Sequence, residues 1–157
     1  MTQYQWLLGL HVVGAFLFVS GAVAAGALQW RARLRDRPSE IALLLELTRI
    51  AVVIVAAGLL ATVAFGAWLV SRGEFHWGDA WIVAALALVV VSVIAGTVGG
   101  RSARHARYLA ERLAAAGDEA SGELKRALAD PKALALNYTS FLAALAVLAL
   151  MVWKPGS

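Results

Sequence analysis

Residues 6–30 read WLLGLHVVGAFLFVSGAVAAGALQW, an apolar run from which the architecture of the whole chain can be worked out. The run contains one ionisable side chain, His11, and the residues that follow it include Arg31 and Arg33. About 20 apolar residues suffice for a helix to cross a bilayer, at about 1.5 Å per residue. On such a helix His11, Gly14 and Gly21 fall on one stripe, so the histidine should face whatever the small residues pack against.

The composition of the whole chain is that of a membrane protein. Of the 157 residues, 61% are hydrophobic and only 15% are charged, and the mean hydropathy is +0.74. A soluble domain carries roughly 25% charged residues. The chain has no cysteine, which excludes thiolate–metal chemistry and disulfides. The net charge of +4 is less informative than the placement of the basic residues.

Three further apolar segments follow the first one, which predicts a bundle rather than a single anchor. The expected spans cover about residues 6–30, 49–70, 80–99 and 134–153. We expect one integral membrane domain over residues 1–157. The predicted fold class is all-α, a four-helix transmembrane bundle whose neighbouring helices are antiparallel.

The basic residues predict the orientation of this bundle. Twelve of the fourteen Lys and Arg residues lie within 31–49 and 101–138. Cytoplasmic loops are the ones that are rich in Lys and Arg. We therefore expect cytoplasmic connections at 31–48 and 101–133, and both termini on the outer side.

Small residues at intervals of four form a ridge on each of the two middle helices. The residues are Gly58, Thr62 and Gly66 on the second helix, and Ser92, Gly96 and Gly100 on the third. Ridges of small side chains allow helix backbones to approach closely. We predict that the second and third helices pack against each other through these two ridges.

His11 is the strongest candidate for a functional residue. An ionisable side chain inside a membrane span marks a site by default, because burying it without a partner costs free energy. Two interpretations stay open: a neutral histidine hydrogen-bonded across the bundle, or a ligand or proton carrier. His76, in the outer turn, is on the same predicted side, and two imidazoles can hold one haem iron between them.

The sequence gives little support for other kinds of functional site. There is no metal-binding spacing such as His-Glu-x-x-His, and the acidic residues lie in loops or near helix ends, without a paired-carboxylate site. Arg101, Arg104 and Arg107 interleave with Leu109 and other apolar residues of the second connection (Tyr108 and Leu113). This pattern is typical of a helix beside an anionic membrane surface, so we expect lipid headgroups there and no nucleic acid.

Two short motifs resemble a known family. LHVVGAF at 10–16 and MVWKP at 151–155 are similar to the bacterial predicted integral membrane family known as domain of unknown function 2269, over nearly the whole chain. More distantly, the early histidine resembles that of copper-resistance D proteins and HemJ-type protoporphyrinogen oxidases. The latter resemblance implies a b-type haem held by His11. This chain departs from that pattern because no second histidine and no lysine lies within a span.

These observations lead to two functional hypotheses. The first is a small structural or accessory protein of the bacterial cytoplasmic (inner) membrane that forms a homo-oligomer or joins a membrane complex, without enzymatic activity. The alternative is a membrane redox protein that binds haem b or handles copper through His11.

Overall fold

The computed structural model describes residues 2–72, 76–119 and 121–153, and most of them are helical. In chain order the helices are α1 (Gln3–Arg33), α2 (Pro38–Arg72), α3 (Ala80–Ala115), α4 (Gly122–Leu128) and α5 (Pro131–Trp153). Four segments are long and apolar enough to cross a membrane, with α4 and α5 taken together as the fourth. The described residues contain no strand. The predicted all-α, four-span fold is confirmed; Lys154 and Pro155 of the C-terminal motif lie outside the described residues.

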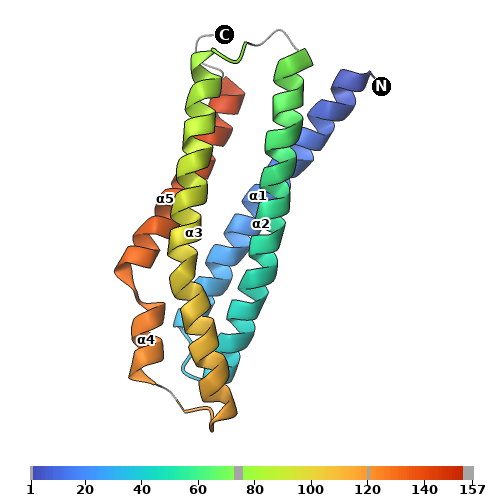
Figure 1. The fold of residues 1–157 in the computed structure, drawn as a ribbon. Coiled ribbons are helices and arrows are strands. Elements are labelled where there is room, and N and C mark those ends of the chain that lie inside the picture. The colour runs from blue at the N-terminus through green and yellow to red at the C-terminus, as the bar shows by residue number, and fades with distance from the viewer. Residues whose placement is uncertain (1, 73–75, 120, 154–157) are drawn as a thin grey trace.

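Local signals set where the helices begin. Pro38 starts α2, where its missing N–H costs nothing and its fixed φ suits a first helical turn. Pro131 starts α5 in the same way, and the Asp130 carboxylate accepts a hydrogen bond from the Lys132 amide at 3.0 Å. Neighbouring long helices run antiparallel, so the start of α1 and the end of α5 lie at one end of the molecule and α4 at the other (Figure 1).

Helices α1 and α2 form a pair with their backbones in close contact. A methyl group at Gly14 would lie 2.8 Å from the amide nitrogen of Thr62, and one at Gly58 would lie 2.8 Å from the carbonyl oxygen of Gly14. Gly21 lies seven residues after Gly14 on α1, and a methyl group there would be 3.1 Å from the carbonyl oxygen of Ala51. Glycine is required at these crossings because no side-chain carbon fits between the two backbones.

The predicted contact between the ridges of α2 and α3 is wrong, because each ridge packs on a different helix. The α2 ridge, which includes Gly58 and Thr62, faces α1. The α3 ridge faces α5, where the Ser92 hydroxyl donates to the carbonyl oxygen of Ser140 at 2.9 Å and the Ser140 hydroxyl donates back to Ser92 at 2.8 Å. Small residues indicate that some helix approaches closely but do not specify which one.

The last two residues of the predicted α3 ridge behave differently from each other. A methyl group at Gly96 would lie 3.0 Å from the Ser140 hydroxyl oxygen, so Gly96 belongs to the α3–α5 contact. At Gly100 the nearest atom outside the local backbone is the Arg104 guanidinium of the same helix, at 3.4 Å. The contact with α5 continues instead through Gly99, where a methyl group would lie 3.2 Å from the carbonyl oxygen of Ala133.

The two helix pairs meet in a small core at the α4 end of the molecule. Its buried members are Ala32, Ile41, Leu45, Ala106, Ala110 and Leu124, contributed by α1 to α4. Leu109 and Leu113 pack against this core. Helix α3 runs unbroken from the apolar span into this region, so the first part of the predicted connection is a projecting end of α3.

Candidate functional site

His11 lies in the contact between α1 and α2. Its Nδ1 is 2.8 Å from the backbone carbonyl oxygen of Thr62. Because a carbonyl oxygen only accepts, Nδ1 carries the proton and donates it. The ring lies over Gly66, where a methyl group would come 2.9 Å from the Cε1 atom of His11. The absence of a side chain at Gly66 is what lets the imidazole reach the backbone of α2.

The other ring nitrogen of His11 has a free lone pair when the ring is neutral, because Nδ1 holds the proton. Among the residues that the structure describes, none forms a hydrogen bond with this Nε2 atom. Near the other end of α1, Gln29 accepts a hydrogen bond from Asn137 of α5 at 3.2 Å.

His76 does not join His11. It is exposed before the start of α3, where the Asp79 carboxylate accepts a hydrogen bond from the His76 amide at 3.0 Å. The partner of His11, Thr62, lies about 15 Å along α2 from its end at Arg72. Within the described residues no hydrogen bond or ring contact links the two imidazoles, and no group of three His, Cys, Asp or Glu is placed to hold a metal ion.

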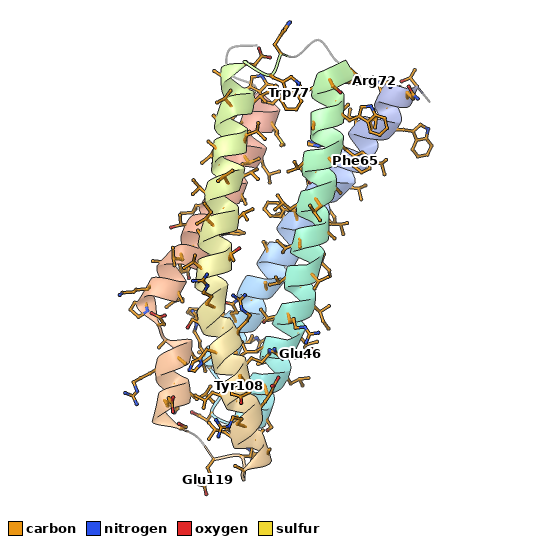
Figure 2. All side chains as sticks on the ribbon, in the orientation of Figure 1. Glu46, Phe65, Arg72, Trp77, Tyr108 and Glu119 are labelled. Carbon is orange, nitrogen blue, oxygen red and sulfur yellow. The ribbon has the colours of Figure 1, made fainter. Side chains whose placement is uncertain are left out.

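The α4 end of the molecule carries an ion-pair network, and Figure 2 shows Glu46 and Tyr108 toward that end, with Arg72 and Trp77 at the other. The Arg107 guanidinium donates to Glu46 at 3.0 Å and to Glu111 at 2.8 Å. Glu46 also pairs with Arg49 at 3.3 Å, a helical pair that their spacing of three residues allows. Of the three arginines expected at lipid headgroups, Arg107 therefore has its charge balanced within the protein.

Two further contacts join the segment between α1 and α2 to the segment between α3 and α5. The Asp118 carboxylate accepts hydrogen bonds from both the amide and the hydroxyl of Ser39, each at 2.7 Å, and so caps the start of α2. The Lys125 ammonium donates to Asp36 at 2.8 Å. This hydrogen bond and the positive charge of Lys125 lower the pKa of the Asp36 carboxyl below its usual range. Sequence patterns gave no signal for either contact.

The polar residues at the start of α5 divide between the interior and the surface. Asn137 and Ser140 form hydrogen bonds to α1 and α3, respectively. The Thr139 hydroxyl donates to the Ala135 carbonyl of its own helix at 2.9 Å, and Tyr138 is exposed. The contact between Asn137 and Gln29 links α5 to α1, and no pattern in the sequence singles out Gln29.

Comparison with known proteins gives one family match. A family model described as predicted integral membrane protein (DUF2269) matches residues 5–155. No curated protein and no solved structure matches the chain. The matched range contains His11 and nearly the full length of all five helices.

Proposed function

We propose that this chain, which belongs to the DUF2269 family of predicted integral membrane proteins, is an accessory membrane protein that self-associates through α1. The observation that carries this proposal is the low coverage of α1 by the rest of the chain. In the most apolar 18-residue stretch of α1 only 11% of the residues are buried, compared with 28% of the residues in the corresponding stretch of α3. Among the four candidate spans α1 has the smallest buried share, which leaves most of its apolar surface for a partner helix.

The uncovered face of α1 has a shape that suits a second helix. A shallow open hollow centred on Gly9 is lined by Gln5, Leu8, Val12 and Val13. A methyl group at Gly9 would meet no atom within 4 Å. Large side chains beside a glycine hollow on one helix are self-complementary, because two copies related by a twofold axis can each place a valine in the other's hollow. A second copy of this chain is therefore the partner that we assign to α1.

The environment of His11 supports a structural role for this residue. A charged side chain within a membrane span costs on the order of 2.5–3.5 kcal/mol, so the ring is expected to be neutral. A neutral imidazole with its proton on Nδ1 is satisfied by the carbonyl oxygen of Thr62. His11 then joins α1 to α2 and leaves the opposite face of α1 available to the partner.

The chain is cysteine-free, so crosslinking of single-cysteine variants in native membranes tests this proposal. Val12→Cys places a thiol on the proposed face, where Val12 is 57% exposed; Val90→Cys on α3 is the matched control, at 56%. Oxidation should give a disulfide-linked dimer with Val12→Cys and monomer with Val90→Cys. Equal crosslinking of the two variants, or none with Val12→Cys, would contradict self-association through α1; a heterogeneous adduct would point to a different partner.

The proposal includes an orientation in the bacterial inner membrane. The Lys- and Arg-rich connections would face the cytoplasm, as such loops do in most inner-membrane proteins. Arg101 and Arg104 are exposed there and are free of carboxylate partners within the described residues, so they would contact anionic headgroups. A reporter that is active only in the cytoplasm, fused after residue 157, should give no signal; the same reporter inserted after Gly117 should be active.

A second function, haem or copper binding, is favoured by one observation at His11. Metal-ligating histidines usually donate their other N–H to a carbonyl or carboxylate oxygen, which fixes the ring orientation. The bond from Nδ1 to Thr62 is of this kind and leaves Nε2 without a hydrogen-bond partner within the described residues. His11→Gln distinguishes the two functions, because glutamine can keep the hydrogen bond to Thr62 but is a poor haem ligand.

A further inference from the structure

A small polar cavity lies where all five described helices, α1 to α5, come together. Its polar lining consists of Gln29, Arg33, Ser102 and Asn137, and most of the remaining wall consists of alanines. The cavity has a volume of about 20 Å³, enough for one water-sized group such as a single oxygen atom of a larger ligand. It is partly open to the outside at the level of the last turn of α1.

Arg33 differs from the other half-buried arginine of the described residues, Arg107. Arg107 is balanced by Glu46 and Glu111. Arg33 is also half-buried, yet within residues 2–72, 76–119 and 121–153 it forms no ion pair and no hydrogen bond. A guanidinium has five N–H donors, and burying them without acceptors is unfavourable. The N–H donors of Arg33 would therefore be satisfied by an anionic group with several acceptor oxygens, which the described residues do not supply.

The depth of Arg33 indicates where such an anion comes from. Trp30, one turn earlier on α1, is exposed, and so is Tyr138, which lies close enough to Arg33 to interact with it electrostatically. Exposed tryptophan and tyrosine side chains mark the headgroup level of a membrane protein. Arg33 and the mouth of the cavity thus lie at the depth of lipid phosphates.

We propose that Arg33 and this cavity bind one phosphate group, with one phosphate oxygen in the cavity and the others on the guanidinium. Arginine suits this ligand because its planar fork can donate two parallel hydrogen bonds to two oxygens. The Gln29 side-chain amide, whose oxygen accepts from Asn137, has its N–H groups left to donate to the oxygen in the cavity. This inference is independent of self-association through α1, which concerns the opposite end of that helix.

Lipid binding to the purified protein tests the proposal, with Arg33→Gln as the variant and Arg31→Gln as the control. Arg31 is in the same turn and carries the same charge but is exposed. Binding of phosphatidylglycerol would be measured by native mass spectrometry and by the rise in melting temperature in neutral detergent. At 0.15 M salt, where exposed charges are screened beyond about 8 Å, Arg33→Gln should weaken binding about tenfold. Arg31→Gln should change it less than about twofold.

Three further results bear on the proposal. Without lipid, Arg33→Gln should melt no lower than the parent, because it removes a cation that has no partner; this also shows that the variant folds. Inorganic phosphate at millimolar concentration should not displace the lipid if the site takes a lipid phosphate, and full displacement would assign it to a free phosphate. Equal weakening by the two variants, or unchanged lipid binding by Arg33→Gln, would overturn the proposal.

Discussion

Replacing Gly58 by alanine should loosen the α1–α2 pair, because a methyl group has no room there. The added carbon would lie 2.8 Å from the carbonyl oxygen of Gly14 and 2.9 Å from the carbonyl carbon of Leu17. Both are backbone atoms of α1, so no rotation of a side chain relieves the contact. The two helices must move apart, which also lengthens the hydrogen bond from His11 to Thr62.

The size of the effect follows from three terms. Overpacking a well-packed contact costs about 1–3 kcal/mol. A weakened interhelical hydrogen bond in a membrane protein costs about 0.6 kcal/mol. Alanine offsets about 0.5–1 kcal/mol of this through its better helix propensity. We therefore expect Gly58→Ala to lower the free energy of unfolding by about 0.5–3 kcal/mol.

Unfolding by SDS in mixed micelles, followed by circular dichroism, measures this difference. Gly26→Ala on α1 is the matched control, because a methyl group there meets no atom within 4 Å. It should leave the protein as stable as the parent or stabilise it by up to about 1 kcal/mol. If Gly58→Ala is as stable as Gly26→Ala, the close contact between the two backbones does not exist.

Other substitutions test the remaining contacts. Asp118→Ala should cost about 1–2 kcal/mol in the same assay, since it removes the cap of α2 and puts alanine at a φ of 61°; Asp118→Asn, which tolerates that φ and keeps one acceptor, should cost less. Ser140→Ala should cost about 0.6 kcal/mol through the lost bond to Ser92, whereas Thr139→Ala should have no effect. Asp36→Asn should destabilise slightly at neutral pH. Because Lys125 lowers the pKa of Asp36 from 3.8, that difference should be full above pH 3.8 and vanish as the pH falls through the lowered value.

The parts of the fold that could be predicted from the sequence are those set by local signals. Apolar run length determines where a span can be, and Pro38 and Pro131 mark the first turns of α2 and α5 because of their own backbone geometry. The contact between Glu46 and Arg107, in contrast, joins residues 61 positions apart, and that between Ser39 and Asp118 joins residues 79 apart. No periodicity within one helix encodes such a pairing.

The same limit applies to the candidate sites. The stripe of His11 and Gly14 indicated that the histidine faces a helix, but its acceptor is a backbone carbonyl, which every residue has. The sequence does not distinguish Arg33 from the other arginines near the first connection. Neither Arg33 nor Arg31 has a carboxylate partner within the described residues, so Arg33 differs from Arg31 in its burial, which depends on how the helices pack.

The absorption spectrum of the protein, purified after expression with ample haem, tests most directly whether His11 only joins two helices. A protein in which His11 is committed to packing α1 on α2 should show aromatic absorption from its six tryptophans and no Soret band. His11→Gln should then be nearly as stable as the parent. A Soret band in the parent that is lost in His11→Gln would contradict the accessory role and identify His11 as a haem ligand.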